Sequence, residues 1–324
     1  MRKTTMFQQP QTFRSKAPAS RSMITTLKRI LGRYPILHAL ARLLTFHRVH
    51  PIFLEYPVEG SPRYGYSQPP HPEITRILEK NRALYIDFLS RCLEYKGQLA
   101  LIDRNRDNGV NPYWMNPMFS GIDAVSLYCT LAIYKPKHYI EIGSGHSTRF
   151  ARLAIRNNKL STRIMSIDPL PRADVSALVD EQIRMPLESA DLSVFQALEP
   201  GDILFIDNSH RVFMNSDVTV VFLEILPRLK DGVIVHLHDI PLPYDYPPQW
   251  QYRFFSEQYM LAVQLLSGNS TMEVLCPCSY ISADEQLKAI LSPLWNMPEM
   301  EGIQTGGYSF WYRKSAPPKA HERP

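Results

Sequence analysis

Apolar runs alternate with segments of helical period along the chain after residue 137. Continuous apolar, β-branched runs are typical of strands buried in a parallel sheet, and they predict strands at 138–142, 163–167, 182–185, 202–206 and 232–238. Apolar residues at helical spacing predict helices at 146–158, 173–179, 216–229 and 256–266, and the runs "MEVLCP" and "YSFWYR" predict two late strands. Such alternation indicates βαβ units with right-handed crossovers on a parallel sheet.

The first third of the chain has a different pattern. Residues 1–22 are polar and basic and are predicted to form a disordered tail. Apolar residues at helical spacing then predict two short amphipathic helices between residues 23 and 46, the second opened by Pro35. A stretch rich in proline, glycine and serine at 57–72 predicts a linker or loop, and helices are expected at about 73–95 and at 121–136.

Charge and cysteine content narrow the class of protein. The 324 residues carry a net charge of +5, but residues 1–54 contain no Asp or Glu, so the remainder is slightly acidic. This is not the basic signature of a nucleic-acid-binding protein. The four cysteines are too few for a disulfide framework, and the C-x-C of Cys276 and Cys278 is interpreted as two buried strand cysteines. A cytoplasmic protein is expected.

The basic N-terminal helices have three interpretations. They could pack on the main domain, which is the favoured one, or lie on an acidic membrane surface at the inner face of a membrane. An acid-poor, arginine-containing N-terminus is also similar to an organellar transit peptide.

The segment "YIEIGSGHSTRF" at 139–150 is typical of a strand, a tight turn and a helix. Glycines in such a turn let a ligand approach the backbone, and the start of the helix offers free N–H groups. The candidate cofactor-binding residues here are Glu141, Gly143, Ser144, Gly145 and Ser147. NAD, FAD, a nucleotide and S-adenosylmethionine all remain possible ligands at this point.

Polar residues follow the other predicted strands. Asp168 ends the second strand, "DNSH" at 207–210 follows the fourth, and "HLHD" at 236–239 closes the fifth. The carboxyl ends of parallel strands are where ligands bind in an open sheet, and Asp168 is placed to accept hydrogen bonds from a ribose. A dinucleotide fingerprint requires a third glycine, which is missing after Gly145. The acidic residue two positions before the first glycine is typical of the methyltransferase form of this turn.

Five ordered blocks carry a family resemblance: "YIEIGSGHST", "GDILFIDNSH", "SDVTVVFLEILPRLKDGVIVHLHDI", "PYDYPPQW" and "GGYSFWYRK". Together, over roughly residues 110–313, they resemble class I S-adenosylmethionine-dependent methyltransferases, in particular the bacterial branch with EIGSGxST and HDI motifs. The resemblance implies an α/β, Rossmann-like, seven-stranded and mostly parallel sheet whose last strand is antiparallel. It also implies S-adenosylmethionine as cofactor and a hydroxyl on a sugar or small molecule as acceptor.

The expected domain division follows from these patterns. A tail at 1–22 precedes a helical N-terminal extension at 23–110, the methyltransferase domain covers 111–315, and a second tail follows at 316–324. Two rival functions stay open, an NAD-dependent oxidoreductase and a non-catalytic protein that binds S-adenosylmethionine.

Candidate catalytic residues lie after the fourth and fifth strands. His210 is the first candidate base, because an imidazole titrates near neutral pH, and Asp207 and Asp239 are the other catalytic candidates. Asp207 is also a candidate for cofactor binding. Catechol-type O-methyltransferases place a metal in a similar layout, so Asp207, His238 and Asp239 could instead hold a divalent ion such as Mg²⁺ or Mn²⁺. The alternative is that His238 and Asp239 bond each other and orient the substrate.

The proline-rich segment "PLPYDYPPQW" at 241–250 follows the fifth strand. Its aromatic residues Tyr244, Tyr246 and Trp250 offer flat surfaces on which a sugar or planar acceptor could stack. Such a loop could close over the site.

Overall fold

The structure, a computed structural model, describes residues 60–106, 109–171, 175–268 and 271–316. All the described residues belong to one compact unit, which begins at residue 60. The predicted tail at 1–22 and the two amphipathic helices between 23 and 46 lie outside the described residues.

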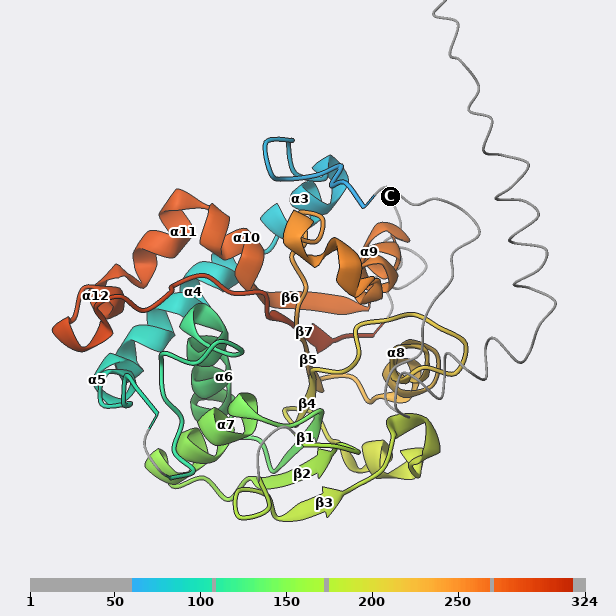
Figure 1. Cartoon of the computed structure of the whole chain (residues 1–324), viewed down its shortest axis with the longest axis horizontal. Coiled ribbons are helices and arrows are strands. Elements are labelled where there is room, and N and C mark those ends of the chain that lie inside the picture. The colour runs from blue at the N-terminus through green and yellow to red at the C-terminus, as the bar shows by residue number, and fades with distance from the viewer. Residues whose placement is uncertain (1–59, 107–108, 172–174, 269–270, 317–324) are drawn as a thin grey trace, which may run out of the picture. The chain divides into compact units, whose positions relative to one another are not determined.

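A seven-stranded sheet runs through the described unit (Figure 1). Its strands are β1 (His138–Ile142), β2 (Arg163–Ile167), β3 (Glu181–Ile183), β4 (Ile203–Ile206), β5 (Ile234–Leu237), β6 (Met272–Pro277) and β7 (Phe310–Lys314). The strand order is β3-β2-β1-β4-β5-β7-β6, and β7 is antiparallel to both of its neighbours. The predicted Rossmann-like sheet with an antiparallel last strand is thus confirmed.

Helices cover both faces of this sheet. Figure 1 shows α6 (Gly121–Tyr134) and α7 (His146–Asn157) on one face, with α8 (Asp217–Val220) and α9 (Glu257–Leu266) on the other. The helix predicted at 216–229 is irregular, because a π-helical turn (Val221–Ile225) and a 3-10 turn (Leu226–Arg228) follow α8. The helix predicted at 173–179 is wrong where it is described, since residues 176–178 form a turn.

The helices before the sheet belong to the same compact unit. They are α3 (Pro72–Glu79), α4 (Arg82–Cys92), a 3-10 turn (Leu93–Tyr95) and α5 (Lys96–Ala100), so one predicted helix is in fact broken near Asn81. Tyr85 and Leu89 are fully buried in the core, and Arg82 pairs with Asp284 at 2.7 Å. The compact unit that contains the sheet thus begins at residue 60 and includes these helices, and the predicted division at 110/111 stays a prediction.

Three short helices connect the last two strands: α10 (Cys278–Ala283), α11 (Glu285–Ile290) and α12 (Ser292–Trp295). Cys276 lies in β6, while Cys278 begins α10, so only one of the two is a strand residue. Both are buried, free thiols whose sulfur atoms lie 3.7 Å apart, and the expected burial is confirmed.

Candidate functional site

The glycine loop between β1 and α7 is fixed by the backbone around it. The N–H of Gly143 donates to the carbonyl of Ile167 at 2.9 Å, and its φ of +79° is one that side chains rarely adopt. A Cβ at Gly143 would lie 1.9 Å from the carbonyl oxygen of Asp207. A Cβ at Gly145 would instead meet nothing within 4 Å. The first glycine is therefore required by packing, whereas the second leaves space open.

Glu141 supports this loop from below. Its carboxylate is fully buried and accepts hydrogen bonds of 2.5 Å from the hydroxyls of Ser147 and Thr148. Burial raises the pKa of Glu141 to about 8, although these hydroxyls act in the opposite direction. Glu141 does not line the cavity above the loop. Its predicted contact with a cofactor is not supported, and it positions the loop instead.

Asp168 joins the ends of β1 and β2. One carboxylate oxygen accepts from the backbone N–H and the hydroxyl of Ser144, at 2.8 and 3.0 Å, and the other accepts from the N–H of Leu170 at 2.8 Å. The side chain is 9% exposed and lines the cavity. Asp168 thus orders the loop and still borders the space that a ligand would occupy.

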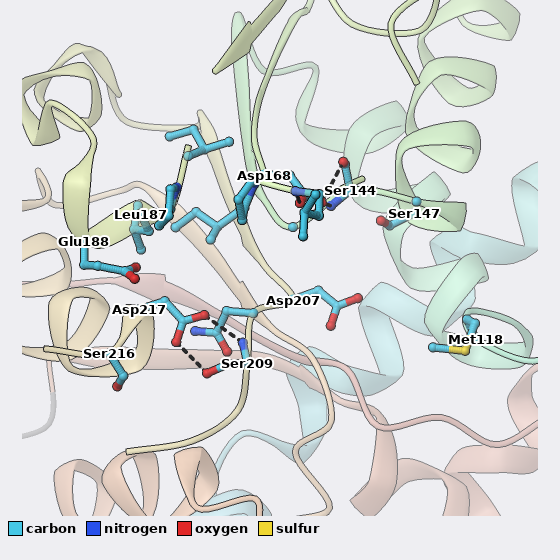
Figure 2. Close-up of a pocket in the computed structure, with 18 of the residues that line it drawn as sticks. Met118, Ser144, Ser147, Asp168, Leu187, Glu188, Asp207, Ser209, Ser216 and Asp217 are labelled. Carbon is cyan, nitrogen blue, oxygen red and sulfur yellow. Dashed lines mark hydrogen bonds between the residues drawn. The ribbon is translucent and has the colours of Figure 1, made fainter. Parts of the chain in front are cut away.

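A cavity of about 530 Å³ lies over the loop, and we name it the glycine-loop cavity. Figure 2 shows Asp168 and Ser144 on one side of it, with Leu187 and Glu188 nearby and the hydrogen-bonded pair Ser209–Asp217 across from them. The other predicted cofactor residues that line it are Gly143, Gly145, Ser147 and Asp207. Its mixed polar and apolar walls are typical of small-molecule sites.

A second cavity of about 740 Å³ adjoins the first, and we name it the histidine cavity. Met118, Phe119 and Asp207 line both cavities. His210, His238 and Asp239 line only the second, so the structure brings all the predicted catalytic residues to one wall. His210 and Asp239 have φ values of +58° and +55°, and such strained backbone is commonly found at functional sites.

His210 is surrounded by carboxylates. Its Nδ1 lies 2.9 Å from Glu257, and its Nε2 lies 3.2 Å from Asp207 and 3.5 Å from Asp239. Because a carboxylate only accepts hydrogen bonds, both ring nitrogens carry protons in this arrangement. Burial would lower the pKa of His210, but these carboxylates raise it to about 10. A charged imidazolium cannot take up a proton, so this geometry favours a positioning role for His210, and its role as the base stays a prediction.

Asp207, His238 and Asp239 form a paired group. Nδ1 of His238 lies 3.7 Å from Oδ1 of Asp207 and 3.5 Å from Oδ1 of Asp239. Burial would lower the pKa of His238, but the two carboxylates raise it to about 9. For Asp207 the effects are reversed. Burial would raise its pKa, but the imidazoles of His238 and His210 hold this pKa below its usual range. Each carboxylate is thus balanced by imidazoles.

The metal alternative stays a prediction. Across the described ranges, no group of three His, Cys, Asp or Glu side chains has a geometry that could hold an ion. Ring nitrogens of His210 and His238 lie 3.2 to 3.7 Å from Asp207 and Asp239, so both carboxylates already face imidazoles. The geometry favours the other hypothesis, in which His238 and Asp239 contact each other.

Two buried carboxylates of this site were not predicted from the sequence. Glu257, the first residue of α9, is fully buried and accepts from His210 and from Asn208 at 3.1 Å. Asp123, in the first turn of α6, accepts from the N–H groups of Tyr308 and Ser309 and lies 3.5 Å from Nε2 of His238. An acidic residue at a helix start is common, so no local signal marks either one.

Loops far apart in the sequence complete the histidine cavity. Gly65 and Tyr66 line it together with Tyr244 and Trp250. Asp245 holds the first loop in place by accepting from the N–H of Tyr64 at 3.1 Å. The described part of the predicted linker at 57–72 is therefore a wall of this cavity.

Of the three aromatic residues predicted at 241–250, Tyr244 and Trp250 line the cavity. Tyr246 does not. It is buried, and its hydroxyl accepts from the N–H of Gln258.

Comparison with protein families matches residues 140–240 to a family described as a methyltransferase domain. This segment runs from β1 to the end of β5 and contains the glycine loop, Asp168, Asp207, His210, His238 and Asp239. Comparison with curated proteins gives no match. None of the described helices is long and apolar enough to cross a membrane.

Solved structures with a similar chain path were also found. A methyltransferase from Podospora anserina with bound S-adenosylhomocysteine is 16% identical, with 71% of this chain and 88% of that chain covered and a TM-score of 0.38. An O-methyltransferase from Bacillus cereus is 14% identical, with 71% and 91% covered and a TM-score of 0.34. The O-methyltransferase TomG from Streptomyces achromogenes is 16% identical, with 71% and 89% covered and a TM-score of 0.33.

Proposed function

We propose that this chain, whose residues 140–240 match a family described as a methyltransferase domain, transfers a methyl group from S-adenosylmethionine to a hydroxyl oxygen. The acceptor would be a sugar or another small hydroxylated molecule. The observation that supports this most is the junction of two cavities at Asp207, Met118 and Phe119. A methyl transfer needs two adjoining spaces, one for each reactant, that meet where the bond is exchanged.

The residues of the glycine-loop cavity suit the cofactor. Gly145 leaves its space open, and the loop backbone can therefore approach a ligand closely. The carboxylate of Asp168 borders the same space and could accept a hydrogen bond from a ribose hydroxyl. When bound, S-adenosylmethionine supplies an electrophilic methyl group next to a sulfonium cation, and the carboxylate of Asp207 at the junction would stabilise that positive charge.

Asp239 is the residue that we assign to the acceptor proton. Its side chain is 16% exposed in the histidine cavity, whereas both ring nitrogens of His210 are already directed at carboxylates. The hydroxyl oxygen would bond to the methyl carbon while its proton passes to the Asp239 carboxylate. His210 and His238 would hold Asp239 in position, and Glu257 would hold His210 from behind.

Transfer of a labelled methyl group tests the proposal. The full chain is mixed with methyl-labelled S-adenosylmethionine and an extract of the cells that make it, and label is sought in small molecules. Label transferred by the wild-type chain, but not by the Asp239→Asn variant, is the expected result. If the wild-type chain transfers no label to any molecule of the extract, the proposed function fails.

A chelator separates the metal alternative from direct proton transfer. We expect EDTA to leave the labelling rate unchanged, because imidazoles already balance Asp207 and Asp239. Loss of labelling with EDTA, restored by Mn²⁺ or Mg²⁺, would show that Asp207, His238 and Asp239 bind a metal ion.

A further inference from the structure

Arg253 differs from the other charged residues that line the histidine cavity. Asp207 and Asp239 face His210 and His238, and Asp123 accepts from two backbone N–H groups and faces His238. No carboxylate within the described residues forms an ion pair with the guanidinium of Arg253. It is thus a cavity-lining cation that no carboxylate of the described ranges balances.

The position of this guanidinium is well defined by aromatic rings. Its central carbon lies 4.9 Å from the centre of the Trp250 ring and 5.5 Å from that of Phe255, and both rings also line the cavity. Stacking on aromatic faces holds an arginine in place. It leaves free the N–H donors, which lie in the plane of the guanidinium group. Trp250 further contacts Tyr308, with ring centres 5.3 Å apart. The cavity thus offers flat apolar surfaces next to an exposed cation that packs on two of them.

From this arrangement we propose that the acceptor carries an anionic oxygen group, a carboxylate or a phosphate, which Arg253 binds while the hydroxyl to be methylated lies at Asp239. This inference rests on the proposed function and specifies its class of substrate. A planar guanidinium binds either oxyanion through two parallel hydrogen bonds, and the rings of Trp250 and Phe255 would face the body of the acceptor. The acceptor is therefore a hydroxylated, ring-shaped anion.

The labelled products of the extract reaction test this class directly. At neutral pH they are passed over an anion exchanger, and we expect the labelled product to be retained and then released by salt. A labelled product that passes through unretained is not anionic and overturns the inference, while methyl transfer itself still stands. Absence of any labelled product is a different result, because it removes the proposed function on which the inference rests.

The two sources of negative charge are separated in the same experiment. Treatment of the retained product with alkaline phosphatase abolishes retention if the group is a terminal phosphate monoester. Retention that survives this treatment points to a carboxylate. Either outcome agrees with binding at Arg253.

Variants of Arg253 link the charge of the product to this residue. With the purified acceptor, Arg253→Gln should raise KM about tenfold to a hundredfold, because a charge-assisted bond is lost, and should change kcat much less. Arg253→Lys should restore part of the loss. Arg228→Gln is the matched control. Arg228 is an exposed arginine outside both cavities, and it pairs with Glu224 of the π-helical turn after α8. Equal KM values for Arg253→Gln, Arg228→Gln and wild type would overturn the assignment.

Discussion

The glycine-loop cavity is bordered by the backbone of a tight turn, whereas the histidine cavity is bordered by charged and aromatic side chains from distant loops. The first depends on the turn after β1, where Gly143 sits against the carbonyl of Asp207 and Gly145 faces open space. The second depends on residues from distant loops, such as Tyr66, His238 and Trp250. Contacts from a loop backbone suit a cofactor that is the same in every related enzyme. Contacts from side chains allow the acceptor to differ between related enzymes.

The largest effect is expected in the histidine cavity. Asp239→Asn keeps the size of the side chain but removes the negative charge that would accept the hydroxyl proton. Labelling should slow by roughly 10²–10⁴. S-adenosylhomocysteine affinity, measured by calorimetry, should stay near that of the wild type, because Asp239 does not line the glycine-loop cavity. A variant that retains wild-type turnover would show that the proton leaves by another route.

Substitutions of the two loop glycines sharpen the comparison, because one should reduce stability and the other should reduce ligand affinity. Gly143→Ala places a Cβ against the Asp207 carbonyl at a φ of +79°, and it should lower the free energy of unfolding by roughly 2–4 kcal/mol. Gly145→Ala meets no atom, so it should cost less stability but weaken S-adenosylhomocysteine binding at least tenfold, to an extent that calorimetry resolves.

Thermal melts of both variants check this pair. If Gly145→Ala destabilises the chain as much as Gly143→Ala and leaves ligand affinity intact, the open space at Gly145 has no role in binding. The backbone of the loop would then serve the fold alone.

Asp168 contributes a side chain to the glycine-loop cavity. Its carboxylate orders Ser144 and borders the ligand space, so Asp168→Ala should weaken S-adenosylhomocysteine binding by about tenfold to a hundredfold. Asp168→Asn is the control, because its amide oxygen can still accept from the Ser144 N–H, and its loss should be smaller. Unchanged calorimetric affinity in Asp168→Ala would exclude a ribose contact.

The smallest effect concerns the pH dependence of stability. The pKa of His210 is raised to about 10 by its carboxylates, above the value of about 6.5 in an unfolded chain. The charged imidazole therefore contributes stability that is complete below pH 6.5 and is lost as the pH rises through 10. The melting temperature should thus fall more steeply between pH 7 and pH 10 in the wild type than in His210→Gln. Parallel curves would show that His210 is not a buried cation.

Most of the sheet could be predicted, because its strands are short apolar runs with few polar interruptions. β1, β2 and β6 match their predicted ranges. The predicted helix at 173–179 failed since nothing local distinguishes it from a turn with apolar residues. The helix after β4 is distorted because a π-helical turn, which no simple periodicity predicts, follows α8.

Only those residues of the candidate site that follow a strand could be predicted from the sequence. Asp168 and Asp207 could be found because each directly follows a strand, and Asp239 because it lies two residues after one. Glu257 and Asp123 could not, because tertiary packing brings two helix starts beneath His210 and His238. The raised pKa of His210 depends on Glu257 and could therefore not be predicted from the sequence. The burial of Glu141 under the loop could not be predicted either, because spacing does not show which way a carboxylate points.

Titration of the purified full chain with S-adenosylhomocysteine and, separately, with NAD tests the central claim most directly, because it asks what the glycine-loop cavity holds. The account predicts one-to-one binding of S-adenosylhomocysteine that is weakened at least tenfold in Gly145→Ala, is unchanged in Asp239→Asn, and is accompanied by no binding of NAD. Binding of NAD without S-adenosylhomocysteine, or S-adenosylhomocysteine affinity that is unaffected by Gly145→Ala, would contradict it.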